Sequence, residues 1–83
     1  MPNRTIIRGS LHAEGRDLGE VVAVAAAGDG PFAGLLILMG AGGRSAFPEG
    51  GWAPAWLSPI GRGPSVAILV RRGSSGSLEF RAR

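Results

Sequence analysis

One glycine-rich stretch gathers the groups that could hold an anion. It reads Gly40-Ala41-Gly42-Gly43-Arg44-Ser45. Exposed backbone amides beside a guanidinium and a hydroxyl can bind a phosphate. A nucleotide-binding P-loop, however, requires a lysine directly before its Ser or Thr, and the chain contains no lysine. The spacing also lacks the glycines and the following helix of a dinucleotide-binding fingerprint. The pattern therefore favours a turn after a strand over a phosphate site.

Groups for acid–base, nucleophilic or metal chemistry are few and scattered. The chain has a single histidine, His12, six carboxylates and no cysteine. One histidine without thiolates is too few for a zinc site. The carboxylates are not paired as acid–base catalysis requires, and no serine lies on the strand-turn-helix elbow of a hydrolase. The sequence therefore predicts a protein that is not an enzyme, with no catalytic residue, no metal site and no cofactor.

The basic charge comes entirely from arginine and is concentrated near the end of the chain. Nine arginines against six carboxylates give a net charge of +3. Residues 61–83 hold Arg62, Arg71, Arg72, Arg81 and Arg83 against Glu79 alone. Small barrels bind nucleic acid by combining a basic groove with stacking aromatic side chains. Because the aromatic residues lie in other segments, we expect only weak, sequence-independent and salt-sensitive binding. A nucleic-acid-binding small β-barrel that uses this arginine-rich third is the alternative function.

Two tryptophans share a proline-bearing stretch. Trp52 and Trp56 lie with Phe47 between residues 45 and 59, which we interpret as a long irregular loop. Indole rings in such a loop can cap a small core, or they can anchor a subunit interface, where tryptophan is enriched. Both interpretations stay open, and we expect at least one of the two rings to contact another subunit.

Glycine and proline divide the chain into short apolar runs. Fifteen glycines and six prolines at short intervals are typical of strands joined by turns. The clearest run, 66–70, lies between Gly61-Arg62-Gly63-Pro64 and Gly73-Ser74-Ser75-Gly76, and it predicts a strand buried on both faces. The other expected strands are 5–8, which can continue through Leu11, then 21–25, 32–39 and 77–81.

A short helix is the alternative for the alanine-rich residues 21–27, but a Gly28-Asp29-Gly30-Pro31 turn cuts it short, so a strand is favoured. The fold class is therefore all-β: a small β-barrel or sandwich of about five or six short strands. Residues 1–83 form one small β domain.

The size of the chain favours association. A chain of 83 residues, 45% of them hydrophobic, has too little material to hide all its apolar surface. Disulfides, metals and association are the usual supplements, and the composition leaves association. The apolar runs fall short of the ~20 residues of a membrane span, and the N-terminal residues lack a signal-peptide core. We expect a cytoplasmic protein, or a virion component if phage-encoded, without a membrane partner.

A family resemblance lies between residues 57 and 75. It is carried by Leu57-Ser58-Pro59-Ile60-Gly61-Arg62-Gly63 and by Ile68-Leu69-Val70-Arg71-Arg72-Gly73-Ser74-Ser75. This stretch resembles the bacterial microcompartment pentameric vertex shell proteins, in which an apolar residue and Gly-Ala-Gly precede a buried strand ending in Val-Leu-Val and then Gly-Ser-Ser. Upstream, residues 21–23 and 34–38 resemble that family's early strands. The resemblance implies a small β-barrel that closes into pentamers, with the turn at Gly73-Ser74-Ser75 near the symmetry axis.

Together these observations predict a non-enzymatic, self-assembling structural protein that forms closed homo-oligomers. It would serve as a shell vertex or as a phage capsid or decoration subunit. The expected partners are copies of the chain itself and other shell or capsid proteins. The expected interface residues are Trp52, Trp56, Arg71, Arg72, Gly73, Ser74 and Ser75.

Overall fold

Six antiparallel strands form a small closed barrel. The computed structural model describes residues 4–26, 33–40, 43–61 and 63–83. The strands are β1 (Arg4–Ala13), β2 (Arg16–Ala26), β3 (Ala33–Leu38), β4 (Ala53–Pro59), β5 (Val66–Arg72) and β6 (Leu78–Ala82), with one 3-10 turn, η1 (Arg44–Ala46), before β4. They follow the order β1-β2-β3-β6-β5-β4 around the barrel, which closes where β4 pairs with β1. The predicted all-β class is confirmed.

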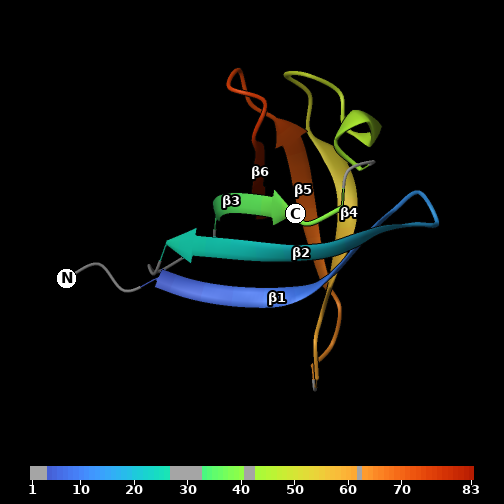
Figure 1. The fold of residues 1–83 in the computed structure, drawn as a ribbon, viewed down its shortest axis with the longest axis vertical. Helices are drawn as coiled ribbons and strands as arrows, with labels where there is room; N and C mark the ends of the chain where they lie inside the picture. The colour runs from blue at the N-terminus through green and yellow to red at the C-terminus, as the bar shows by residue number, and fades with distance from the viewer. Residues whose placement is uncertain (1–3, 27–32, 41–42, 62) are drawn as a thin grey trace.

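The hairpin of β1 and β2 is longer than the barrel is tall. Figure 1 shows it crossing β4 and β5 at a steep angle and projecting beyond them toward the N-terminus. Its two-residue turn has positive φ at both Glu14 (52°) and Gly15 (74°), as a type I′ turn requires. A register shift between Ser10 and His12 leaves an extra residue on β2, where Gly19 takes a φ of 101°. The bulge lies within the segment of β1 that pairs with β4, Gly9 to His12, while residues 4–7 extend past β4.

The core is built from the inward residues of all six strands and one residue from a loop. The largest fully buried side chains are Phe47, Phe80, Leu11, Leu36, Leu57, Ile68, Leu78, Val21 and Val70. Phe47 lies directly after η1, and the other eight lie on strands. Burying a side chain of this size stabilises a fold by roughly 1.5–3 kcal/mol, so these nine account for most of the apolar contribution.

The barrel closes around a glycine. Gly9 on β1 is the register partner of Pro59 on β4 and is buried. A Cβ placed on Gly9 would meet the carbonyl oxygen of Ser58 at 2.2 Å. No real side chain tolerates that approach to a backbone atom, so only glycine fits where β1 and β4 meet.

Four of the sequence-based strand predictions are confirmed with small changes of bounds. Residues 5–8 lie in β1, which continues past Leu11, while 21–25, 32–39 and 77–81 correspond to β2, β3 and β6. The strand interpretation of the alanine-rich run is therefore correct. Gly73-Ser74-Ser75-Gly76 forms the predicted turn, in which the Gly73 N–H donates to the Ser77 carbonyl at 2.8 Å. The turn predicted at 28–31 lies outside the described residues.

Two predictions about the second half of the chain are wrong. Residues 45–59 are not one long loop, because β4 occupies their last seven positions. Pro54 is accommodated at the start of β4, beyond the segment that pairs with β1. Residues 66–70 form β5, but this strand is buried on one face only: Ile68 and Val70 point into the core, while Ala67 and Leu69 are half-exposed outside. Closure of a single small barrel covers one face of each strand and leaves the other outside.

Candidate functional site

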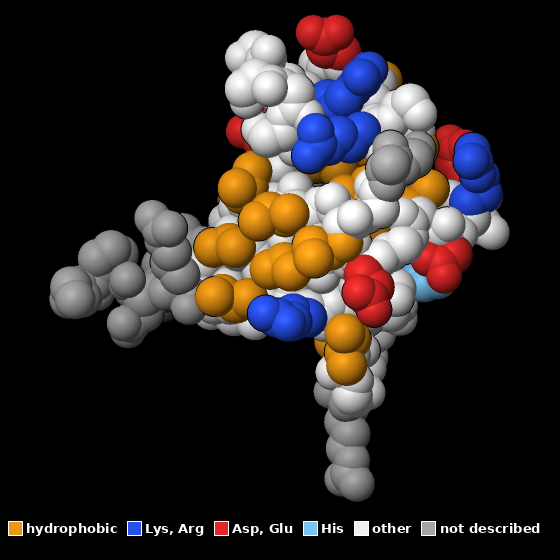
Figure 2. All heavy atoms as spheres, viewed as in Figure 1, with side chains coloured by type: hydrophobic (Ala, Val, Ile, Leu, Met, Phe, Trp, Pro, Cys, Tyr) orange, Lys and Arg blue, Asp and Glu red, His pale blue; other side chains and the backbone are white. Residues whose placement is uncertain are grey.

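The outer surface of the barrel carries an aliphatic face. It consists of Ile6, Val22, Val24, Leu35 and Ile37, which are outward residues on β1, β2 and β3, with Met39 at its end. Cross-strand register brings Val22 opposite Ile37, and Val24 lies between Ile6 and Leu35. Figure 2 shows this group as a continuous apolar area over the β1–β3 side of the molecule.

This aliphatic face is unusually open for a small monomer. Ile6 is 62% exposed, and Leu35 and Ile37 are each 41% exposed. Single apolar side chains on a surface are ordinary, but a contiguous apolar area is typical of an interaction site. Arg8 and Glu20, both exposed, occupy the neighbouring outward positions on β1 and β2. These two charges border the face on β1 and β2, and Glu79 on β6, the register partner of Leu35, borders it on the other side.

An unpaired strand edge adjoins the same face. β1 pairs with β2 along its whole length, but its pairs with β4 run only from Gly9 to His12. The next contact on that side is the Ile60 N–H, which donates to the Arg8 carbonyl at 2.8 Å. Among the described residues, none pairs with the outer edge of β1 from Arg4 to Ile7. Unpaired N–H and C=O groups on an edge are a template for pairing with another chain.

A second surface, the Trp–Arg face, lies on the outside of β4, β5 and β6. Its centre is Trp52, which is half-buried just before β4. The guanidinium carbon of Arg71 lies 4.5 Å from the centre of this indole, and that of Arg81 lies 4.4 Å from it. Two arginines from adjacent strands are therefore held by one aromatic ring. Each such contact contributes about 0.5–1 kcal/mol at an exposed site.

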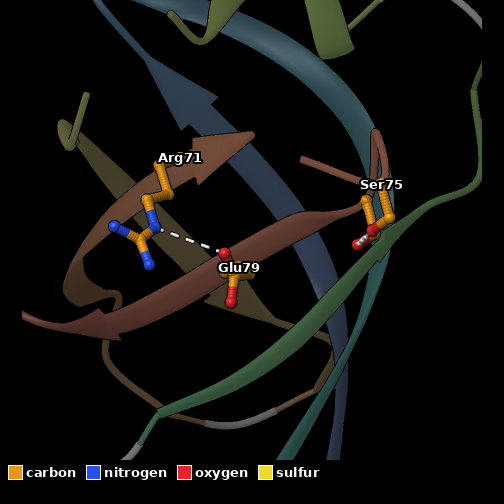
Figure 3. A network of polar contacts seen from close by, with 4 residues as sticks. Arg71, Ser75 and Glu79 are labelled. Atoms are coloured by element: carbon orange, nitrogen blue, oxygen red, sulfur yellow. Dashed lines mark hydrogen bonds and ion pairs between the residues drawn. The ribbon is translucent and has the colours of Figure 1, made fainter. Parts of the chain in front are cut away.

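A carboxylate neutralises one of these two arginines. The Nε of Arg71 donates to Glu79 Oε1 at 3.2 Å, and Figure 3 shows this contact bridging β5 and β6. Both side chains are well exposed, so the pair adds little stability. In the described part of the chain, no carboxylate lies within ion-pair distance of Arg81 or Arg83. The Trp–Arg face therefore carries a net positive charge.

The second tryptophan extends this face toward β1. Trp56 is on β4, opposite His12 of β1, and is 47% exposed as a whole residue. The guanidinium carbon of Arg83 lies 5.2 Å from the centre of its ring, while Nη2 of Arg83 donates to the Ala55 carbonyl at 3.3 Å. His12, Trp56 and Arg83 line one shallow, open hollow. His12 is half-buried at this hollow.

The remaining predicted interface residues lie at one rim of the barrel. Arg72 points to the opposite side of β5 from Arg71 and donates from Nε to the Phe47 carbonyl at 3.1 Å. The turn after it is held by its own backbone and by a contact between the Ser75 and Ser77 hydroxyl oxygens at 2.9 Å, visible in Figure 3. Arg71, Arg72, Gly73 and Ser74 line one open hollow, and Arg71 also contacts Trp52, so the structure brings most of the predicted interface residues close together.

The glycine-rich stretch leads into a single 3-10 turn. Arg44 is the first residue of η1, which follows the N-cap Gly43. Ala41 and Gly42 lie outside the described residues. Across the described ranges, no group of three His, Cys, Asp or Glu side chains comes together as metal ligands. No helix in that part of the chain is long and apolar enough to cross a membrane.

Comparison of the chain with protein-family models, with curated proteins and with solved structures finds no match.

Neither outer face was predicted from the sequence, and the reason differs between the two. The arginines and tryptophans lie in separate segments, and only the pairing of β4 with β5 and of β5 with β6 places Trp52 beside Arg71 and Arg81. The signal for the aliphatic face was present as uninterrupted apolar runs at 21–25 and 34–39. A strand in a single-layer barrel has only one face in the core, so an apolar run there also places apolar side chains outside.

Proposed function

We propose that this chain is a non-enzymatic, self-assembling protein whose aliphatic face is covered by a second copy of itself. The observation that carries the proposal is the contiguous exposure of Ile6, Leu35 and Ile37 beside the unpaired edge of β1. Apolar burial contributes roughly 25 cal/mol per Å² removed from water, so covering this face favours association. Closed, symmetric homo-oligomers are the usual result.

The borders of the face support a second copy as the occupant. A twofold contact places the same patch of both subunits together, so each charged residue meets a different residue of the other subunit. Arg8, opposite Val22, and Glu20, opposite Ser10, are diagonal neighbours of opposite charge at the border. Across a twofold axis, each can face its counterpart of opposite sign. An unrelated partner would have to supply both charges independently.

The edge of β1 supplies a second means of association. Residues 4–7 carry β-branched Thr5, Ile6 and Ile7, which suit a strand, and their outer N–H and C=O groups are not paired within the described chain. Pairing of this edge with another subunit would satisfy these groups and extend the sheet across the contact. This subunit contact differs from the one expected at Trp52 and Trp56, which stays a prediction. We propose that oligomers formed in this way serve as a shell vertex or as a capsid subunit.

A single introduced thiol tests the contact because the chain has no cysteine. Ile6→Cys places a thiol on the aliphatic face, and Ala46→Cys places one on η1 at another exposed position. We expect a short bismaleimide to link Ile6→Cys into covalent dimers at low micromolar concentration, and to leave Ala46→Cys monomeric on a denaturing gel. Equal, low cross-linking of both variants would contradict the proposal.

Amide hydrogen exchange tests the strand edge separately. Arg8 accepts from Ile60 on the β4 side, so the alternate residues 4 and 6 present their N–H groups at the open edge. The backbone amides of residues 4 and 6 should exchange more slowly in the wild-type assembly than in a monomeric variant such as Ile37→Arg, because pairing across subunits protects them. Unchanged exchange across residues 4–8 would show that the edge stays unpaired and that only side chains make the contact.

A further inference from the structure

We propose that the Trp–Arg face binds single-stranded nucleic acid. Trp52, Trp56, Arg71, Arg81 and Arg83 form one outward surface across β4, β5 and β6. This surface adjoins the aliphatic face, because Leu35 on β3 is the register partner of Glu79 on β6, so oligomeric mass is measured beside binding in the test below. The tryptophans and arginines are far apart along the chain, but they lie together on this surface. Their separation in the sequence therefore does not argue against nucleic-acid binding.

The geometry of Trp52 leaves the arginine donors available. A guanidinium that stacks on an indole uses the face of its planar group, while its N–H donors point outward in that plane. The guanidinium carbon of Arg81 lies over the ring, 4.4 Å from its centre, without a carboxylate partner among the described residues. Its N–H donors are therefore available to a phosphate, which a guanidinium can bind through two parallel hydrogen bonds. Stacking also restrains the side chain before binding, which lowers the entropy lost on contact.

The spacing of the arginines suits a chain of phosphates rather than a single anion. Arg81 and Arg83 are two positions apart at the end of β6, so their Cα atoms lie about 7 Å apart. This distance is close to the step between successive phosphates of an extended single strand. Arg71, on the neighbouring strand, is the register partner of Glu79. Three guanidinium groups thus border one open surface from two strands.

Trp56 favours a nucleic acid over an acidic peptide as the ligand, because its indole ring can stack on a base. Trp56 as a whole residue is 47% exposed, the guanidinium carbon of Arg83 lies 5.2 Å from its ring centre, and His12 lies opposite it on β1. A base can stack on such a ring, which contributes about 1–3 kcal/mol in single-strand binding proteins. An extended acidic peptide has no aromatic group to place there in a regular way. A duplex cannot offer unstacked bases, so the ring favours a single strand.

Glu79 lowers the affinity that we expect this surface to have for phosphates. Its carboxylate accepts a hydrogen bond from Arg71 Nε at 3.2 Å and adds a negative charge where phosphates would lie. Removing this charge should tighten binding, whereas a purely structural role for the Arg71–Glu79 pair predicts no gain. Glu79→Gln keeps the shape of the side chain and is therefore the most informative substitution.

The test is fluorescence anisotropy of the intact protein with a labelled oligothymidylate of about 12 nucleotides, within the site size of small barrels. We expect binding at about 50 mM salt that weakens by about twentyfold at 200 mM, because each arginine contact contributes about 0.7 to the slope for single strands. Arg81→Ala should lower that slope by about 0.7. The matched control, Arg44→Ala, removes the same charge from η1 and should leave it unchanged.

Two further variants separate stacking from charge. Trp56→Ala should weaken binding by about tenfold without a change in salt slope. Glu79→Gln should tighten it by about twofold to fivefold, the effect of one nearby charge in high dielectric. Circular dichroism and oligomeric mass, measured on each variant, keep these effects distinct from changes in folding or assembly.

Three outcomes would overturn the proposal. The first is no measurable binding by the wild-type protein at about 50 mM salt. The second is equal binding of a duplex of the same sequence, which would show that exposed bases are not recognised. The third is equally effective competition by polyglutamate of matched charge, which would make the surface a general site for acidic chains.

Discussion

Val24 on β2 and Leu35 on β3 are register partners, and both side chains point out of the barrel rather than into it. Their neighbours Ala23 and Leu36 are register partners too, but these are fully buried. The same two strands therefore present apolar pairs to the core and to the outside. A strand pair that is apolar on both faces is expected where a second layer covers the outer face.

Covering this pair with another subunit makes thermal stability depend on concentration. The Tm of the wild-type protein should rise by a few degrees when its concentration is raised about a hundredfold, because association stabilises the folded state by mass action. Leu35→Ser should abolish that rise. Scanning calorimetry over this concentration range checks both. A Tm that is independent of concentration in the wild-type protein would argue against self-association.

The close approach of β1 to β4 predicts a strong effect of one methyl group. Gly9→Ala should lower the free energy of unfolding by about 1–3 kcal/mol or more, because its Cβ would meet the Ser58 carbonyl oxygen at 2.2 Å. Gly40→Ala is the matched control, since nothing lies within 4 Å of its added Cβ. Urea denaturation measures both. Equal stability of the two variants would show that β1 and β4 separate readily.

Phe47 should matter to the fold as much as any strand residue. It is fully buried although it lies in the connection between η1 and β4. Phe47→Ala should destabilise the protein by about 3–5 kcal/mol, the usual loss for a buried phenylalanine. Phe47→Leu should retain most of the stability because it fills much of the same volume. If Phe47→Ala lost under about 1 kcal/mol by urea denaturation, the loop would not be part of the core.

The turn after β5 distinguishes a subunit contact at Gly73-Ser74-Ser75 from one at the aliphatic face. If the resemblance to vertex shell proteins holds, Ser74 lies near a symmetry axis, and Ser74→Trp should block assembly without unfolding the chain. The side chain of Ser74 is exposed, so the substitution meets nothing in its own subunit that would prevent folding. Light scattering with circular dichroism measures both properties. An oligomer of unchanged mass would remove the resemblance as an argument for the contact.

The strands could be predicted from the sequence because their limits are marked locally. Glycine and proline bound the runs that became β2, β3 and β5, and alternation identifies β6. The turn at Glu14-Gly15 was missed because glutamate is an unusual residue at positive φ, so β1 was expected to end earlier. β4 was missed because prolines at its start and end are typical of loops, although both positions lie at the limits of the strand.

The candidate sites could not be predicted in the same way because they depend on pairing between distant segments. Trp52 meets Arg81 only after β5 has paired with both β4 and β6, and no local pattern encodes that order. The general expectation of exposed apolar surface followed from the size of the chain. The location of that apolar surface on β1, β2 and β3 could be known only from the strand register, which places Val24 and Leu35 on the outside.

The oligomeric mass of wild-type protein and of Ile37→Arg tests the central proposal most directly. Ile37 is 41% exposed on the β3 side of the aliphatic face, opposite Val22, and an arginine there would bury a charge in the subunit contact without entering the core. Light scattering coupled to size exclusion, at low micromolar concentration, should give a whole multiple of the chain mass for the wild type and for the control Ala46→Arg. It should give the mass of one chain for Ile37→Arg, with an unchanged circular dichroism spectrum. A wild-type protein that elutes as a folded monomer, or an Ile37→Arg variant with the wild-type oligomeric mass, would contradict self-assembly through this face.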